Sequence, residues 1–396
     1  MSHGDGRTPP AGGCVTADAR WSLAFIAHEV HRRGGQERAA AEILSRVAQR
    51  ASVTVIARAC ELAGVEWMRI DVPSRPSVLR TWAFARAAAA AERRAGCTIS
   101  NAIGAAAREA DVITAQFCHA AFTARYGGLR GGSGMGAVYQ RFAQERFVAE
   151  ERHAYGASRL RRVIAVSQGT ARELQEHYRV PESVIRVVPN GVDHAVFRPA
   201  ADAAAKRALR VRLGLPTDAF LALFVGGDWA RKGVRDAVDA IGPLADVHLV
   251  VVGRGDSVAL RAHAARAGAS DRVHVVAPTP KPEEYYAAAD AFAFPSRYEA
   301  FSLVTLEAAA SGLPLICHAI NGTEELVAEG VNGWLVPFGA EAIRERLHEL
   351  RDDVALRTRM SAAALASSQR YAWDRVADEY HAVLADAAGA TPPGTR

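Results

Sequence analysis

Two glutamates, Glu299 and Glu307, stand eight positions apart in the mostly apolar stretch RYEAFSLVTLEA, residues 297–308. On one continuous helix, the second side chain would lie about 80° round the axis from the first and roughly 12 Å along it. That separation is too large for a close catalytic pair. If Glu299 instead lies in a loop and Glu307 in the second turn of the helix that follows, the two carboxylates can hold separated parts of one elongated ligand.

The segment that contains the two glutamates also predicts an anion-binding site. DAFAFP at 290–295 has the composition of a buried strand, and the residues after it predict a loop over 297–301 and a helix over 302–311. Backbone amides at the start of a helix lack intrahelical partners and attract anions. Here those amides belong to Phe301, Ser302, Leu303 and Val304. A nucleotide sugar carries sugar hydroxyls, a diphosphate and ribose hydroxyls in that order. The first carboxylate, the start of the helix and the second carboxylate occur in the matching order.

A pair of cations, Arg231 and Lys232, follows another predicted strand. Such a pair is usually an exposed surface feature. This chain contains 45 Arg and only three Lys, so a lysine is rare in this protein and its presence in this loop is informative. An ammonium can reach a phosphate as a point charge while the adjacent guanidinium binds it bidentately. The pair is therefore a candidate diphosphate clamp.

Two glycines and one histidine follow predicted strands of the first half of the chain. Gly34 and Gly35 allow a ligand to approach the backbone closely, although a plain turn before a helix explains them equally well. His119 follows the predicted strand DVITAQF at 111–117. A lone histidine is more often structural than catalytic, and both roles stay open for it.

Composition and charge are those of a globular protein with an anionic partner. The 396 residues are 49% hydrophobic and 23% charged, which predicts two domains of ordinary size. The net charge of +5 is uneven, because residues 1–200 carry 27 Arg against 18 acidic residues. The first half should attract an anionic partner, with nucleic acid, an acidic membrane and phosphorylated metabolites as the classes to weigh.

Targeting patterns and cysteine spacing predict a cytoplasmic protein without a structural metal. The start of the sequence lacks the basic, apolar and small-residue regions of a signal peptide, and no apolar run approaches the ~18 residues that span a bilayer. Cysteines occur singly and without CxxC spacing, at Cys14, Cys60, Cys97, Cys118 and Cys317. Neither a zinc site nor a disulfide framework is expected.

Strand and helix patterns alternate along the chain in two series. Four strands are predicted in the first half, at 21–27, 52–58, 111–117 and 161–167, and five in the second, at 219–227, 247–253, 272–277, 290–295 and 313–318. Near-continuous apolar strands alternating with helices are typical of an α/β protein with doubly wound parallel sheets. Such sheets bind ligands at the carboxyl ends of their strands, here most naturally in the crevice between two domains. The predicted segments are a tail at 1–18, domains at 19–198 and 199–370, a helix at 371–387 and a tail at 388–396.

An ordered set of motifs resembles the retaining GT-B glycosyltransferases of the family-4 type, over roughly residues 20–385. EAFSLVTLE at 299–307 is similar to the motif of two glutamates separated by seven residues in that family, and GGDWARKG at 226–233 resembles a variant found in enzymes like lipopolysaccharide-core glucosyltransferases. Further matches occur in the expected order: GGQE at 34–37, VIAVS at 163–167, PNGVD at 189–193 and SGLPLICHAINGTEELVAEGVNGWLVP at 311–337. Gly227 departs from the family, which often has an arginine there.

The resemblance implies a role for each candidate residue. Glu299 would hold the hydroxyls of the donor sugar and Glu307 the ribose, while Arg231 and Lys232 would clamp the diphosphate together with the amides of 300–304, beginning at Ala300. Gly34 and Gly35 would form a loop near the diphosphate and the acceptor, and His119 would point at the reacting sugar. The resemblance also implies two Rossmann-like domains, the first for the acceptor and the second for the donor. The helix at 371–387 would cross back to the first domain.

The expected reaction is transfer of a sugar, with retention of configuration, to a hydroxyl of a glycolipid or polysaccharide, as in polysaccharide or lipopolysaccharide biosynthesis. A UDP-sugar is the favoured donor and GDP-mannose the next. No Asp-x-Asp pair occurs, so a metal-independent enzyme without a cofactor is expected, in which cations and helix amides stabilise the leaving diphosphate. Nucleic acid is not an expected partner.

Other functions of the same fold stay open at this point. They are glycosylation of a secondary metabolite, a nucleotide-sugar epimerase or hydrolase, and a non-enzymatic partner that binds a sugar nucleotide. Peripheral contact between the basic first domain and the inner face of the cell membrane is another option. Residues 75–94 would form the amphipathic helix at that surface, with an ordinary packed helix as the commoner alternative.

Overall fold

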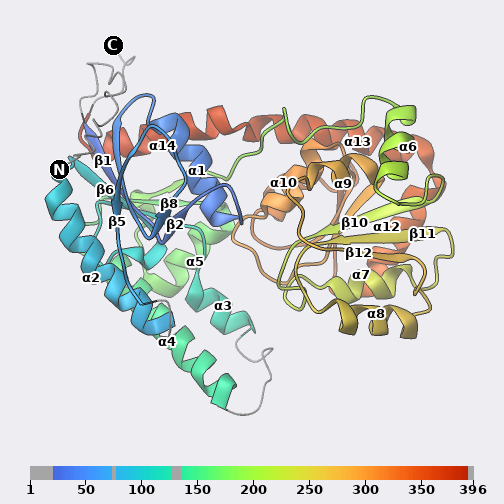
Figure 1. Ribbon diagram of the computed structural model, residues 1–396, viewed down its shortest axis with the longest axis horizontal. Helices are drawn as coiled ribbons and strands as arrows, with labels where there is room; N and C mark the ends of the chain where they lie inside the picture. The colour runs from blue at the N-terminus through green and yellow to red at the C-terminus, as the bar shows by residue number, and fades with distance from the viewer. Residues whose placement is uncertain (1–20, 74–76, 127–134, 391–396) are drawn as a thin grey trace, which may run out of the picture.

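The computed structural model describes residues 21–73, 77–126 and 135–390. Figure 1 shows two lobes side by side, each built on a β-sheet flanked by helices. The predicted tail at 1–18 lies outside the described residues, as does the end of the predicted tail at 388–396. Within the described ranges, no helix is both long and apolar enough to cross a membrane.

The first lobe contains a parallel sheet of seven strands in the order β5-β3-β1-β6-β7-β8-β9. Its strands are β1 (Ser22–Ile26), β3 (Ser52–Ala57), β5 (Glu66–Arg69), β6 (Ile99–Ile103), β7 (Val112–Ala115), β8 (Arg162–Ala165) and β9 (Ile185–Val187). A separate pair joins β2 (Glu29–Val30) to β4 (Ala59–Cys60). All four strands predicted for this half are present, as β1, β3, β7 and β8.

Helices cover both faces of this sheet. They are α1 (Gln36–Val47), α2 (Ser77–Ala95), α3 (His119–Tyr126), α4 (Met135–Tyr155) and α5 (Gln168–Tyr178), with short 3₁₀ turns at Gly104–Ala106 and Glu182–Val184. Ser167 caps α5, because its hydroxyl accepts a hydrogen bond from the amide of Thr170 at 2.9 Å. This cap places the start of α5 at the carboxyl end of β8.

The second lobe contains a parallel sheet of six strands in the order β12-β11-β10-β13-β14-β15. Its strands are β10 (Phe220–Val225), β11 (Val247–Val252), β12 (Val273–Val276), β13 (Ala291–Phe294), β14 (Leu315–His318) and β15 (Gly333–Val336). Its helices are α6 (Ala203–Arg212), α7 (Val234–Ile241), α8 (Ser257–Arg266), α9 (Glu283–Ala288), α10 (Leu303–Ala310), α11 (Thr323–Leu326), α12 (Ala340–Asp352) and α13 (Val354–Ser368). All five strands predicted for this half are present.

The order of the strands fixes where a ligand can bind in the second lobe. β10 lies between β11 and β13, so the sheet grows in one direction up to β12 and then in the other from β13. Open α/β sheets bind ligands at such a reversal, outside the carboxyl ends of the strands. The loops after β10 and β13 carry Arg231, Lys232 and Glu299.

The last helix, α14 (Trp373–Ala387), packs on the first lobe although it follows the second in sequence. In Figure 1 it runs as a red ribbon beside α1. Trp373, Val376 and Tyr380 are buried in the core that also contains the inner residues of β1 and α1. A 3₁₀ turn at Gln369–Tyr371 precedes this helix. Ala388 and Ala390, which belong to the predicted tail at 388–396, pack against the same core.

The two lobes also touch along the start of α5. The hydroxyls of Ser167 and Thr170 donate to the carbonyl oxygen of Ala300, at 2.8 and 3.2 Å. The amide of Gln168 donates to Glu325 on α11 at 2.8 Å. These contacts hold the loop after β13 against the first lobe, so the crevice between the lobes is closed along this side.

Candidate active site

A cavity of about 380 Å³ lies between the lobes, at the carboxyl ends of β10 and β13. Every residue predicted from the sequence lines it, except His119. These residues are Gly34, Gly35, Arg231, Lys232, Glu299, Ala300, Phe301, Ser302, Leu303, Val304 and Glu307. Residues that are 273 positions apart in the chain, from Gly34 to Glu307, are thus gathered around one space.

Glu299 is paired with both predicted cations. Its Oε1 atom lies 2.9 Å from Nη1 of Arg231 and 3.4 Å from Nζ of Lys232, and it accepts a hydrogen bond from Ser296 at 3.0 Å. Burial opposes the charge of Glu299, but the attraction of Lys232 and Arg231 outweighs it and lowers the pKa of the carboxyl below its usual value. Glu299 is therefore a carboxylate at neutral pH.

The loop after β10 holds the two cations in fixed positions. Nε of Arg231 donates to Asp228 at 3.0 Å, and its Nη1 also donates to the carbonyl oxygen of Tyr298. Nζ of Lys232 lies 4.8 Å from the centre of the Phe294 ring, within the range of a cation–π contact. A Cβ atom on Gly226 would lie 2.7 Å from Cδ of Lys232, so glycine at this position makes room for the lysine stem.

Helix α10 begins at the cavity with its amides directed to the loop after β13. Ser302 caps the helix by accepting a hydrogen bond from the amide of Thr305 at 3.3 Å. The first i to i−4 bond of this helix comes from the amide of Leu306. The amides of Leu303 and Val304 precede that bond, as the sequence predicted, and form an end of the helix suited to an anion.

Glu307 lies in the second turn of α10 and its side chain is only 4% exposed. Nη2 of Arg38 donates to its Oε1 atom, and the hydroxyl of Tyr286 donates to its Oε2 atom at 2.8 Å. The sequence pointed to Glu307 but to neither of these partners. Arg38 belongs to α1 of the first lobe and Tyr286 to α9 of the second, so the carboxylate is held from both lobes.

The first lobe contributes a glycine loop and a pair of amides to the cavity. Gly34 has φ +82°, a conformation that favours glycine, and a Cβ atom there would lie 2.6 Å from Oε2 of Glu37. Gln116 and Asn190 exchange two hydrogen bonds, at 3.0 and 3.2 Å. Asn190 is part of the PNGVD motif, which pointed to it, whereas nothing in the sequence singled out Gln116.

His119 does not line the cavity. It opens α3, and its Nδ1 atom lies 3.1 Å from Oε1 of Gln144 on α4. Its ring lies between those of Phe117 and Phe147, at 4.8 and 5.0 Å between centroids. Burial lowers the pKa of His119, so the imidazole is neutral at physiological pH. The residue of this segment that lines the cavity is Phe117.

The donor set of the cavity suits an elongated anionic ligand. Glu299 and Glu307 can accept hydrogen bonds from hydroxyls, while Arg231, Lys232 and the start of α10 can bind an anion between them. Among the described residues, no group of three or more His, Cys, Asp and Glu side chains is arranged to hold a metal ion.

Two family models match the chain, one on each lobe. The model described as Glycosyltransferase Family 4 matches residues 33–196, and the model described as Glycosyl transferases group 1 matches residues 205–366. The first contains Gly34 and Gly35, and the second contains both glutamates and both cations. The matched residues thus include both sides of the cavity.

Curated relatives are named D-inositol 3-phosphate glycosyltransferase. The protein of Xylanimonas cellulosilytica is 37% identical over 260 residues, which are 63% of this chain and 62% of the relative. The protein of Thermomonospora curvata is 34% identical over 280 residues, again 63% of this chain and 62% of the relative. The chain therefore spans about three fifths of the length of these relatives.

Solved structures share the fold over nearly the whole chain. WaaG, a glycosyltransferase involved in lipopolysaccharide biosynthesis, matches with a TM-score of 0.78 at 22% identity and covers 91% of this chain and 99% of its own. The Anabaena protein HepE in complex with UDP-glucose matches with a TM-score of 0.74 at 19% identity and covers 93% of this chain and all of its own. The two lobes are thus the Rossmann-like domains of a GT-B fold. With a family model on each domain, the chain belongs to the family-4 glycosyltransferases.

Proposed function

We propose that this protein transfers a sugar from a nucleoside-diphosphate sugar to an acceptor hydroxyl. The observation that carries the proposal is the arrangement of Glu299, the Arg231 and Lys232 pair, the start of α10 and Glu307 along one cavity between the domains. In that order they complement a sugar, a diphosphate and a ribose. UDP-sugars are the favoured donors, followed by GDP-mannose.

The mechanism assigns charge stabilisation to the second domain. As the bond between sugar and diphosphate breaks, negative charge grows on the leaving phosphate, where Arg231, Lys232 and the amides of Leu303 and Val304 stabilise it. Before the donor arrives, Glu299 pairs with both cations and offsets part of their charge. In the complex, the diphosphate takes over that role and Glu299 binds hydroxyls of the sugar.

Retention of configuration is part of the proposal. The acidic side chains among the described residues that line the cavity are Glu299 and Glu307, and both are held by hydrogen bonds from protein groups. We therefore favour attack on the same face that the diphosphate leaves, with the departing phosphate accepting the proton of the acceptor hydroxyl. Detection of a glycosylated carboxylate by mass spectrometry would replace this step with a covalent one.

The acceptor is assigned to the first domain and is proposed to be a hydroxyl of a glycolipid or polysaccharide. A second candidate acceptor, D-inositol 3-phosphate, is favoured by the names of the relatives at 34 to 37% identity. The excess of Arg over acidic residues in 1–200 suits either an anionic lipid surface or a phosphorylated small molecule. Product formation with each acceptor separates the two candidates.

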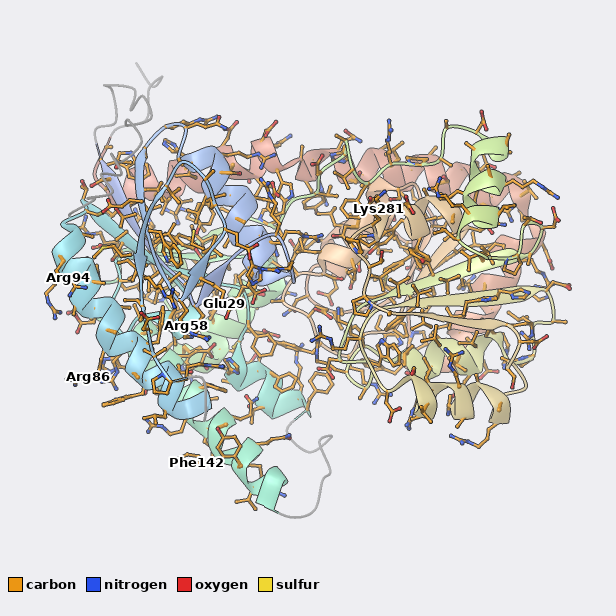
Figure 2. The ribbon with its side chains drawn as sticks, viewed as in Figure 1. Glu29, Arg58, Arg86, Arg94, Phe142 and Lys281 are labelled. Carbon is orange, nitrogen blue, oxygen red and sulfur yellow. The ribbon has the colours of Figure 1, made fainter. Side chains whose placement is uncertain are left out.

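Peripheral membrane contact is a further part of this proposal. Helix α2 exposes Leu79 and Trp82, which are 46% and 44% exposed, and Figure 2 shows Arg86 and Arg94 on the outer side of the same helix. Figure 2 also shows Phe142, 51% exposed, on the projecting part of α4. An exposed aromatic among arginines suits an interfacial helix. Sedimentation with anionic and with zwitterionic vesicles tests the contact, and equal sedimentation with both would contradict it.

Thermal unfolding against UDP, GDP, ADP and their sugar conjugates, with EDTA present, tests the donor assignment. A ligand at 100 times its dissociation constant should stabilise the folded protein by ~2.7 kcal/mol. We expect one nucleotide to raise the midpoint without metal, and the Glu307→Ala variant to lose that effect. If no nucleotide raises the midpoint, the cavity is not a nucleotide-sugar site.

Two other outcomes would identify a different function on the same fold. Consumption of the donor without any acceptor indicates an epimerase or a hydrolase, whereas binding without turnover indicates a non-enzymatic partner. Metal independence and the lack of a cofactor are also part of the proposal, and turnover that survives EDTA is the result they require.

A further inference from the structure

Arg38 reaches across the crevice from the first domain to a carboxylate of the second. It lies in the first turn of α1, and its guanidinium donates to Oε1 of Glu307, a residue 269 positions away in the sequence. Tyr286 holds the other oxygen, Oε2, from within the second domain. The orientation of the Glu307 carboxylate thus depends on one donor that stays with it and one that comes from the other domain.

Because both side chains are largely buried, the interaction between Arg38 and Glu307 is strong. The side chain of Glu307 is 4% exposed and that of Arg38 is 24% exposed. A buried carboxylate without a cationic or hydrogen-bonding partner is strongly disfavoured. Burial opposes the charge of Arg38 as well, but the attraction of Glu307 outweighs it and raises the pKa of Arg38. Glu307 therefore stabilises the charged form of Arg38.

The segment that joins the domains contacts Arg38. Cζ of Arg38 lies 5.9 Å from the centre of the Phe197 ring, and Phe197 precedes α6 in the connection between the domains. The Phe197 ring in turn packs edge-on against Tyr286, at 5.5 Å and 85°. Arg38, Phe197, Tyr286 and Glu307 therefore form a closed ring of contacts beside the connection between the domains. Opening of the crevice must separate Arg38 from Glu307.

We propose that Arg38 is a positioning residue for the donor nucleotide, which orients Glu307 toward the ribose only when the two domains are closed. A carboxylate offers about four acceptor sites, so Arg38 and Tyr286 together leave capacity on both oxygens for ribose hydroxyls. Recognition of the ribose is thereby coupled to closure of the crevice. This inference rests on the proposed nucleotide-sugar function and deepens it.

Binding of ribonucleotides and their 2′-deoxy counterparts tests the proposal. UDP, GDP and ADP are titrated calorimetrically against the wild type, Arg38→Met and Arg38→Lys, and each is then compared with its 2′-deoxy form. For the nucleotide that the wild type prefers, we expect Arg38→Met to weaken binding of the ribonucleotide about tenfold, as for loss of a charge-assisted hydrogen bond. The dissociation constant of the deoxynucleotide should change by less than about threefold, so most of the preference for the ribonucleotide is lost. Arg38→Lys should restore part of that preference.

A direct contact between Arg38 and phosphate would give a different result. Arg38→Met would then bind the ribonucleotide and the deoxynucleotide more weakly by the same factor, and the proposal would be overturned. Arg46→Met is the matched control, because Arg46 lies on the same helix and pairs with Asp374 at 2.6 Å, outside the cavity. This control should keep the wild-type preference for ribose, which separates loss of an arginine on α1 from loss of the Glu307 contact.

Small-angle X-ray scattering tests the coupling to closure. With saturating ribonucleotide, the wild type should be more compact than Arg38→Met, and with deoxynucleotide the two should be alike. Equal compaction of both proteins by the ribonucleotide would refute the coupling. A wild type that binds no nucleotide at all would instead refute the proposed function, so the two failures are distinguishable.

Discussion

Replacing Glu299 by glutamine should make the bare nucleoside diphosphate bind more tightly while turnover is lost. In the wild type, Glu299 pairs with Arg231 and Lys232 at 2.9 and 3.4 Å, offsets part of their positive charge and repels an incoming diphosphate. Glutamine has no charge, so the cations attract the diphosphate without competition from this side chain. The same change replaces the carboxylate proposed to bind the sugar hydroxyls with a neutral amide, which is a weaker acceptor, so turnover should fall by two orders of magnitude or more, about 3 kcal/mol of transition-state stabilisation.

The magnitude follows from the geometry of the pair. One unit charge acts on another with ~4 kcal/mol at 4 Å in a medium of effective dielectric constant about 20, and the phosphates would lie beyond the cations at roughly twice that distance. The side chains of Arg231 and Lys232 are 21% and 13% exposed, so solvent screens part of the interaction. We expect a net gain of about 1–2 kcal/mol, a factor of about 5 to 30 in the dissociation constant of the diphosphate.

Isothermal titration of UDP and GDP into wild type and Glu299→Gln measures this gain. The free protein should be less stable in the variant, since two partly buried cations lose their partner. Glu341→Gln is the control, because Glu341 is 80% exposed on α12 and pairs with Arg344 at 3.5 Å. Weaker binding of the diphosphate in Glu299→Gln would refute the reasoning, because it would mean that Glu299 helps to bind phosphate instead of competing with it.

Three further predictions concern the domain contact, the pH dependence and the lysine clamp. Tyr298→Phe removes the hydroxyl that lies 2.9 Å from Glu173 across the domain boundary, and should lower the stability measured by thermal unfolding by about 1.5–3 kcal/mol; an unchanged midpoint would show that this contact is dispensable. Burial raises the pKa of Glu151 to about 8, above its unfolded value, so its contribution to the free energy of unfolding is fully present below about pH 4.5 and is lost as the pH rises through about 8. The free energy of unfolding of Glu151→Gln, measured with urea, should lack that loss. A dependence of stability on pH equal to that of the wild type would contradict this prediction. Gly226→Ala introduces a Cβ atom 2.7 Å from Cδ of Lys232 at φ +145°, so nucleotide affinity by calorimetry should fall at least tenfold, about 1.4 kcal/mol, and unchanged affinity would argue against Lys232 as a clamp.

The elements around the site could be predicted from the sequence because each is determined locally. β10 and β13 are continuous apolar runs, and α10 begins with the capping residue Ser302 directly after the loop of Glu299. By contrast, β6 was missed because it contains two polar residues, Ser100 and Asn101, which are fully buried. Their partners, Asp111 and Tyr380, lie outside β6, and Tyr380 is 279 positions from Asn101. Contacts of this kind leave no local pattern.

The candidate site shows the same division between local and distant information. Glu307 stands out because an acid among apolar residues requires a partner, yet its partner Arg38 is one of 45 arginines and comes from the other domain. His119 was predicted to point at the reacting sugar because of its position after a strand, where the family resemblance implies that role. The structure instead directs its ring toward Gln144 on α4, an orientation that depends on how two helices pack.

The most direct test of the central claim is to incubate the protein with UDP-sugars and GDP-mannose, in EDTA, together with D-inositol 3-phosphate or a lipid-linked acceptor. Mass spectrometry then detects the product, and NMR of its anomeric proton gives the configuration. We predict release of the nucleoside diphosphate together with an acceptor that has gained one sugar in the donor's anomeric configuration, and at least about a hundredfold slower product formation with Glu299→Gln. Binding of the donor without transfer to either acceptor, or equal activity in the variant, would contradict this prediction.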